Sequence, residues 1–251
     1  IIKWRARMML FVWFKPLSAT LSLKISVLKI VSERTRMPTS ILRSLLASNK
    51  SFASIDLDSN NIETGGGTEI PDYLATNPPL EVLRLTNNHL DDNDAVMIAR
   101  ALKQNTNLLR FCLGQNDITD VGRDALRNAI FDSTSLNAVA ASNHSCSIDG
   151  FDLDNISNNP SRKSKINRGR KIYSVLSSRN REGTNVRHLD AEFEDDDLKF
   201  VPKVLESVHN HIRLAKSSTY PTDSAVQPLS IMYGILRSWK MPTLYENNGA
   251  S

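Results

Sequence analysis

Cysteine is scarce in this sequence, and long hydrophobic runs are missing from it. The two cysteines among 251 residues, Cys112 and Cys146, are too few for a disulfide framework and lack the short spacing of a zinc site. The apolar stretch from Met8 to Phe14 is far shorter than the ~20 residues that a membrane-spanning helix needs. We therefore expect a reducing compartment, the cytoplasm or as an alternative the nucleus, and no membrane association.

Charge of one sign is also in short supply, because the net charge is only +4 and aromatic residues make up 6% of the chain. A dedicated nucleic-acid binder is much more basic, so nucleic acid is not the expected partner. One local run, residues 162–171, departs from this balance. Its basic residues are Arg162, Lys163, Lys165, Arg168, Arg170 and Lys171. A solvated loop is favoured there, with binding of nucleic acid or an import receptor as the alternative, since no RNA-binding aromatic pattern accompanies the run.

The N-terminal segment, residues 1–24, has two interpretations. Lys3, Arg5 and Arg7 precede the apolar stretch and together with it resemble the start of a signal peptide. Lys15-Pro16 interrupts that pattern and no small-x-small cleavage site follows, so we favour an edge segment that covers the first repeat. The sequence opens at Ile1 rather than methionine, which is consistent with a missing or a processed start.

A repeated spacing of apolar residues, L-x-x-L-x-L-x-x-N-x-L, dominates the next part of the chain. Three good copies start 28 residues apart and consist of Phe52, Ile55, Leu57, Asn60, Ile62; Leu80, Leu83, Leu85, Asn88, Leu90; and Leu108, Phe111, Leu113, Asn116, Ile118. A degenerate fourth copy, another 28 residues on, has Leu136, Val139, Ala141, His144 and Cys146. A worn upstream copy has Ile25, Leu28, Ile30 and the apolar stretch 41–46.

Each good copy continues into a segment with helical spacing. Ile70, Ile98 and Leu126 share one slot, and Leu74, Leu102 and Ile130 lie four residues later. Gly66 and Gly122 are expected just ahead of these helices, and Asn77 and Asn105 just after them. The pattern predicts units of strand, turn, helix and turn that stack into a parallel sheet with helices on its other side.

One residue type recurs where each predicted strand ends. Asn60, Asn88 and Asn116 occupy the same position in the three good copies. An asparagine side chain offers both a donor and an acceptor to backbone groups that the turn leaves unpaired. We therefore predict a structural asparagine ladder rather than a catalytic role.

The segment LRLTNNHLDDNDAVMIARALKQNTNL and its period resemble the ribonuclease-inhibitor-like class of leucine-rich repeats, and are similar to uncharacterised repeat proteins of unicellular algae. The resemblance covers residues 25–150. It implies an α/β fold: a leucine-rich-repeat solenoid in a partial horseshoe, with a parallel sheet inside and helices outside. It also implies partner binding on the concave face. Some repeats of this class activate small GTPases, which gives an alternative function.

Four regions follow from these patterns: an edge segment at 1–24, the repeats at 25–150, a basic polar linker at 151–170, and a helical cap or tail at 171–251. Helices are predicted in the tail at Lys171–Ser178, Lys199–His209 and Pro228–Trp239. Met232, Leu236 and Trp239 of the third helix are predicted to cover the thin last layer of the repeats, where Ala141 and Cys146 replace larger residues.

The side chains between the buried leucines are expected on the concave face of the sheet. They form four columns: Ser54, Val82, Arg110, Ala138; Asp56, Arg84, Cys112, Ala140; Asp58, Thr86, Gly114, Ser142; and Ser59, Asn87, Gln115, Asn143. From these columns the residues predicted to contact a partner are Asp56, Asp58, Arg84, Thr86, Arg110 and Cys112.

Catalytic and metal-binding patterns are weak. No Ser-His-Asp, Cys-His or paired-carboxylate arrangement can be argued from spacing. The acidic run 192–197 lacks the alternation of a calcium loop, and His209 and His211 have no partner cluster. We therefore expect no enzyme activity, no cofactor and no metal. The function predicted from the sequence is that of a scaffold or adaptor that binds another protein.

Overall fold

The computed structural model describes part of the chain, and it divides into two compact units. The described residues are 8–14, 25–32, 36–47, 52–151, 158–159, 164–194, 206, 208–209, 230–231 and 233–235. Unit 1 is drawn from residues 1–132 and 141–163, and unit 2 from residues 133–140 and 164–251. Among the described residues, no helix combines the length and the apolar character that crossing a membrane requires.

The described part of unit 1 contains a six-stranded sheet whose strands follow one another in chain order. The strands are β1 Met8–Phe14, β2 Ile25–Ser32, β3 Ser54–Asp56, β4 Val82–Arg84, β5 Arg110–Cys112 and β6 Ser147–Asp149. β1 is antiparallel to β2 and forms an edge of the sheet, while every later pair is parallel. The predicted parallel sheet is confirmed, and the worn upstream copy supplies one of its strands, β2.

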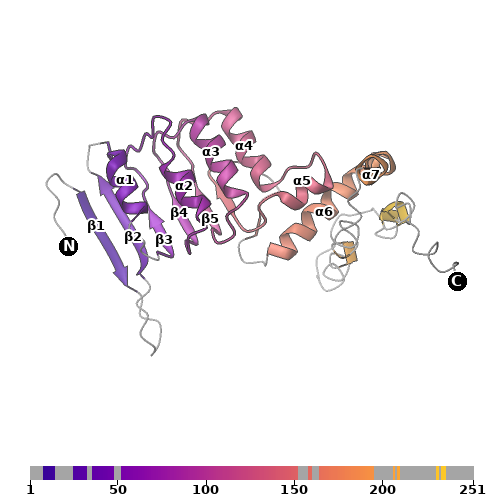
Figure 1. Ribbon diagram of the computed structural model, residues 1–251, viewed down its shortest axis with the longest axis horizontal. Helices are drawn as coiled ribbons and strands as arrows, with labels where there is room; N and C mark the ends of the chain where they lie inside the picture. The colour runs from indigo at the N-terminus through magenta and orange to yellow at the C-terminus, as the bar shows by residue number, and fades with distance from the viewer. Residues whose placement is uncertain are drawn as a thin grey trace, which may run out of the picture. The chain divides into compact units, whose positions relative to one another are not determined.

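Four helices of unit 1 alternate with the strands. They are α1 Thr39–Leu46, α2 Glu69–Ala75, α3 Asp92–Leu102 and α4 Asp120–Ile130. They lie side by side along the sheet (Figure 1), as the alternation of strand and helix requires. The described residues thus form an α/β repeat fold.

The core of unit 1 lies between the sheet and these helices. Ile55, Leu83 and Phe111, the middle residues of β3, β4 and β5, are almost fully buried, as are the six helix positions predicted from the repeat. Burying one such large side chain stabilises a fold by about 1.5–3 kcal/mol. The apolar residues that alternate along the strands and those spaced four apart on the helices therefore pack together in one core.

Carboxylates tie neighbouring helices to one another. Asp91 caps α3 through a reciprocal pair of hydrogen bonds with Asp94, each 3.0 Å long. Asp92 reaches the next helix, where it accepts hydrogen bonds from the N–H groups of Thr119 at 2.8 Å and Gly122 at 3.0 Å. A Cβ on Gly122 would lie 2.6 Å from the Asp92 carboxylate, so the close approach needs glycine. Gly122 lies inside α4, not ahead of it as predicted.

The fourth copy of the repeat does not follow the predicted spacing. Ser54, Val82 and Arg110 are paired in register at steps of 28 residues, but the partner of Arg110 on β6 is Ser147, a step of 37. Residues 136–141, expected to hold the fourth strand, instead form helix α5, Leu136–Ala141. The prediction was wrong because Leu136 and Val139 are spaced three apart, which suits a helix face as well as the repeat.

A buried asparagine restores the pattern after this longer step. Asn143 donates to the carbonyls of Leu102 and Asn105, both at 2.6 Å, and accepts from the N–H of Cys146 at 2.8 Å. Asn105 makes the equivalent contacts one repeat earlier, donating to the Leu74 carbonyl and accepting from the Leu108 N–H. Cys146 therefore occupies the layer of Leu108, not that of Ile118 as predicted. His144 does not take the place of a ladder asparagine.

Unit 2 contains most of α5 together with α6, Ser164–Arg181, and α7, Asn185–Glu194. Its buried apolar residues include Leu136, Val139, Ile172, Leu176 and Leu189. Arg179 and Glu192 form an ion pair of 2.9 Å that is almost fully buried, and Glu192 also accepts from the Leu136 N–H at the start of α5. This ion pair and the hydrogen bond to Leu136 join α5, α6 and α7.

The tail agrees only partly with the helices predicted there. α6 starts at Ser164, within the segment expected to be a linker, and contains the predicted helix Lys171–Ser178; α7 was not predicted. The basic run is therefore helical from Ser164 on, and Lys171 is buried. Residues 206, 208–209, 230–231 and 233–235 are helical. The predicted covering residues Met232, Leu236 and Trp239, as well as Arg162, Lys163 and His211, lie outside the described residues.

Candidate partner-binding face

The face of β3, β4, β5 and β6 that points away from the buried core is here called the open face. Two columns of side chains cross it in register: Ser54, Val82, Arg110 and Ser147, and Asp56, Arg84, Cys112 and Asp149. The first three members of each column are those predicted. Ala138 and Ala140 belong to α5, and Ser142 and Asn143 follow it, so these four residues are not part of the columns.

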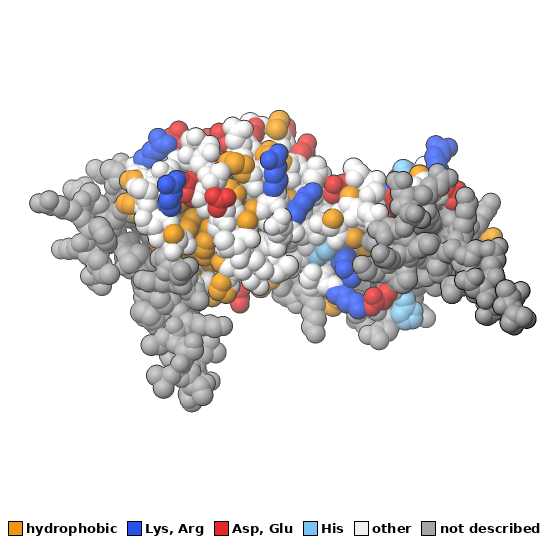
Figure 2. All heavy atoms as spheres, in the orientation of Figure 1, with side chains coloured by type: hydrophobic (Ala, Val, Ile, Leu, Met, Phe, Trp, Pro, Cys, Tyr) orange, Lys and Arg blue, Asp and Glu red, His pale blue; other side chains and the backbone are white. Residues whose placement is uncertain are grey.

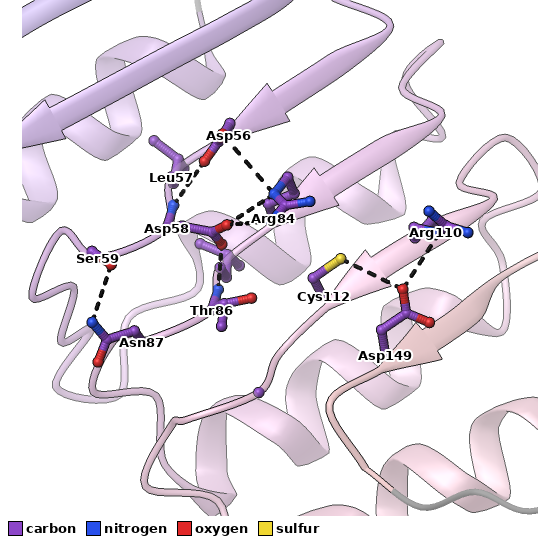
Figure 3. A network of polar contacts seen from close by, with 12 residues as sticks. Asp56, Leu57, Asp58, Ser59, Arg84, Thr86, Asn87, Arg110, Cys112 and Asp149 are labelled. Carbon is purple, nitrogen blue, oxygen red and sulfur yellow. Dashed lines mark hydrogen bonds and ion pairs between the residues drawn. The ribbon is translucent and has the colours of Figure 1, made fainter.

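Arg84 joins β4 to β3 across the open face (Figure 3). Its guanidinium lies 2.8 Å from Asp58 Oδ2 and 4.0 Å from Asp56 Oδ2. The hydrogen bond to Asp58 is the main cause that raises the pKa of Arg84 above its ordinary value. Arg84 is thus held in one position between two carboxylates.

The carboxylate of Asp58 also fixes the backbone of the next strand. Its Oδ1 accepts from the Thr86 N–H at 2.7 Å, and Asp58 itself donates its N–H to Asp56 at 3.1 Å. Thr86 therefore takes part through its backbone, and its side chain is half-buried. The guanidinium, two carboxylates and one turn form a single network.

A row of left-handed turns borders this network. Ser59, Asn87 and Gln115 recur 28 residues apart with φ of 59°, 58° and 56°, and Asn87 donates to the Ser59 hydroxyl at 3.0 Å. Residues other than glycine adopt this conformation only where their surroundings hold it. The row gives the open face a rigid polar margin.

A second network links β5 to β6. Asp149 lies 3.4 Å from the Arg110 guanidinium, and the Cys112 thiol donates to the same carboxylate at 3.8 Å. Cys112 lies on the face that points away from the core, as predicted, but it is only 8% exposed. Burial, more than the nearby Asp149, raises the pKa of the thiol, which disfavours the reactive thiolate. Cys112 is consequently a poor contact residue and a poor redox centre.

Asp149 is the one residue of these networks that the sequence analysis did not identify. The sequence of β6, Ser-Ile-Asp, is identical to that of β3, so Asp149 occupies the same place in its strand as Asp56. This identity could have located β6 from the sequence. The prediction missed it because a fixed period of 28 residues placed the fourth strand earlier in the chain.

Two glycines bring the ends of β5 and β6 together. Gly150 has φ of +105°, and a Cβ on it would lie 2.3 Å from the backbone nitrogen of Gly114. Nothing larger than glycine fits this approach without a shift of the backbone. The backbones that follow β5 and β6 therefore approach each other closely, with no side chain between them.

The three asparagines of the predicted ladder lie where the strands turn away. Asn88 accepts from the Asn60 and Ile62 N–H groups at 3.1 and 2.9 Å and donates to the carbonyls of Leu57 and Leu85. Asn116 repeats this arrangement by accepting from the Leu90 N–H and donating to the carbonyl of Leu85. The side chains of Asn88 and Asn116 each satisfy backbone groups of two successive turns.

The charged residues of the open face lie in the two networks described above. Among the described residues, no group of three His, Cys, Asp or Glu side chains is placed to hold a metal ion. In these networks Arg84 and Arg110 face three carboxylates, those of Asp56, Asp58 and Asp149.

A comparison with known families identifies the repeats. The family model described as Leucine Rich repeat matches residues 76–99 and 104–126. The chain contains leucine-rich repeats. The two matched repeats carry β4 with Arg84 and β5 with Arg110, the strands at the centre of the open face. No curated protein matches the chain.

Proposed function

We propose that this chain is a protein-binding scaffold or adaptor, not an enzyme, and that it binds its partner on the open face of its leucine-rich repeats. The observation that carries the proposal is that Arg84 and Arg110 are held by carboxylates of neighbouring strands while about half of each side chain, 45% and 53%, remains exposed. Side chains fixed before binding lose less conformational freedom when a partner docks.

The proposed contact residues are not equivalent. The Asp56 and Asp58 side chains are mostly buried and act as supports for Arg84. Arg84 and Arg110 retain guanidinium N–H groups that point to solvent and suit carbonyl or carboxylate acceptors of a partner. Thr86 and Cys112 contribute little direct contact. The two arginines therefore form the centre of the proposed site.

The size of the face limits the partner surface. Four strands at about 4.8 Å spacing span roughly 20 Å across the sheet. That width accommodates one helix or one loop of a partner, whereas a standard protein interface buries about 800 Å² on each side. We propose a single helix or loop as the bound element.

A pull-down from cell extract tests the site with charge-neutral variants. The test variant is Arg84→Gln with Arg110→Gln, and the matched control is Arg123→Gln with Arg127→Gln, two exposed arginines of α4. We expect the control to retain the partners that wild type captures and the test variant to lose them. Equal retention by all three proteins removes the open face from consideration.

We further propose that the repeats form a solenoid of the ribonuclease-inhibitor-like class in the cytoplasm, with the C-terminal tail covering its last layer. The parallel pairing of β2 to β6 and the leucine-rich-repeat match support the solenoid. Comparing the thermal unfolding of residues 1–251 with that of residues 1–163 tests whether the tail covers the last layer of the repeats. A lower midpoint for the shorter chain is expected, and an unchanged midpoint with monomeric behaviour contradicts it.

The two alternatives have no comparable support among the described residues. Activation of a small GTPase is implied only by resemblance to repeats of this class. For binding of nucleic acid or an import receptor, the run 162–171 is helical where described, Lys171 is buried, and Lys165 pairs with Glu206. Single-turnover GTP hydrolysis with a panel of small GTPases tests the first alternative.

A further inference from the structure

A cavity of about 560 Å³ lies between α1 and α2, on helices rather than on the strands of the open face. Its walls include Arg43, Leu46, Glu69, Asp72, Tyr73 and Pro78. On the side drawn in Figure 2, hydrophobic side chains gather over the part of the molecule that carries α1 and α2, with acidic and basic side chains beside them. The cavity therefore combines apolar walls with charged groups, as binding sites for small or side-chain-sized ligands do.

Glu69 is the unusual residue of this cavity. Its side chain is only 5% exposed, and Oε1 accepts from the Arg43 guanidinium at 2.7 Å. Its other oxygen, Oε2, is buried and has no hydrogen-bond partner. A buried carboxylate oxygen without a donor is costly, so a donor that a ligand brings to Glu69 would remove this cost.

The charges around the cavity favour a cationic ligand. Glu69 and Asp72 provide two carboxylates, whereas Arg43 is the one cation among the described wall residues. Arg43 is 74% exposed and reaches Glu69 from the rim. It thus occupies one carboxylate oxygen in the way a ligand cation would and leaves the second without a donor.

We propose that this cavity receives a lysine side chain of a protein partner, whose ammonium group pairs with Glu69 and Asp72 while its methylenes lie against Tyr73 and Pro78. An ammonium group supplies three donors on a slender apolar stem, which matches an orphaned carboxylate behind apolar walls. The cavity exceeds the volume of one small amine, so flanking residues of a peptide find room in it. This second surface is independent of the open face.

NMR titration of the full chain tests the proposal with the capped tripeptide Ac-Ala-Lys-Ala-NH2. We expect saturable shifts of the amides of residues 68–76 at millimolar concentrations, as suits so small a ligand. The analogue with norleucine in place of lysine should bind at least about fivefold more weakly, because it lacks the charge. Butylamine should also bind more weakly than the peptide, and equal binding overturns the assignment to a protein side chain in favour of a free amine.

Variants fix the sign of the effect. Glu69→Gln should weaken lysine-peptide binding about fivefold or more, whereas Glu63→Gln, a matched change at an exposed carboxylate outside the cavity, should leave it unchanged. Arg43→Gln should strengthen binding, because it removes the cation that competes for Glu69. Weaker binding by Arg43→Gln, or no saturable shift in wild type and Arg43→Gln at about 10 mM peptide, overturns the proposal.

Discussion

The central repeats and the C-terminal end of the sheet place successive strands side by side, but they use different lengths of chain between those strands. From β3 to β5 the paired residues advance 28 positions per strand, and from β5 to β6 they advance 37. Asn105 and Asn143 nevertheless hold equivalent backbone groups on either side of the longer step. A buried amide that holds the same backbone groups thus precedes both β5 and β6, although the apolar spacing between the two strands differs.

The largest expected effect comes from removing these amides. Asn105→Ala in the regular region and Asn143→Ala at the end should each lower the free energy of unfolding by about 4 kcal/mol, because each leaves several buried backbone groups unpaired. Urea denaturation measures the change. A loss below about 1 kcal/mol for Asn143→Ala alone would show that the end of the sheet does not depend on its asparagine.

The next largest effect comes from truncating the buried side chain that precedes β5, Leu108, and the one that precedes β6, Cys146. Leu108→Ala should cost about 3 kcal/mol and leave a cavity, whereas Cys146→Ala, which removes a single sulfur atom from the equivalent place, should cost about 1 kcal/mol. Both residues are fully buried, so exposure does not confound the comparison. Urea denaturation measures the two losses of unfolding free energy. Equal losses would contradict the expectation that the smaller Cys146 side chain contributes less than Leu108 at the equivalent position.

Gly150 gives a smaller effect that is specific to the end of the sheet. Gly150→Ala should cost about 2 kcal/mol, because its Cβ meets the backbone of Gly114 in addition to the strain of a positive φ. Gly65→Ala is the matched control: it has φ of +60° and open space around it, so only about 1 kcal/mol is expected. The difference between their midpoints measures the close approach of β5 and β6.

The smallest expected effect concerns Asp92, which links two helices of the central repeats. Hydrogen bonds from Thr119, first of all from its hydroxyl, lower the pKa of Asp92 below its ordinary value of 3.8. Its stabilising effect is therefore complete above pH 3.8 and is lost as the pH falls through the lower, folded-state pKa.

The substitution Asp92→Asn should accordingly destabilise the protein at neutral pH, and the difference from wild type should shrink in acid. Asp120→Asn, the same position one repeat later, is the control, since that carboxylate contacts the exposed Arg123. Thermal midpoints measured from neutral pH into acid give the result. A difference that does not depend on pH would contradict the role of the charge.

The central repeats could be predicted from sequence because every level of the pattern agrees there. Leu83 and Phe111 satisfy strand alternation, while Ile98 and Leu102 satisfy helical spacing, and the period fixes which strands pair. The partners of Arg84 could not be predicted in the same way, because the period gives register but not the direction in which a long side chain reaches.

The end of the sheet escaped prediction because two signals conflicted. The apolar pair Leu136 and Val139 fits both the repeat and a helix, and the fixed period favoured the first interpretation. The polar signals, Asn143 and the Ser-Ile-Asp of β6, pointed to the correct strand but carry little hydrophobicity. Asp149 was missed with them, and with it the contacts of Arg110 and Cys112.

The pairing of each arginine of the open face with a carboxylate affects how fast a partner binds. Because Arg84 and Arg110 each face a carboxylate within 3.4 Å, their fields largely cancel a short distance from the surface. A partner is then not drawn in from afar, and its association rate constant should lie near the unassisted range of about 10⁵–10⁶ M⁻¹s⁻¹ and vary little with salt. Differences in affinity between partners would then come mainly from differences in their dissociation rate constants.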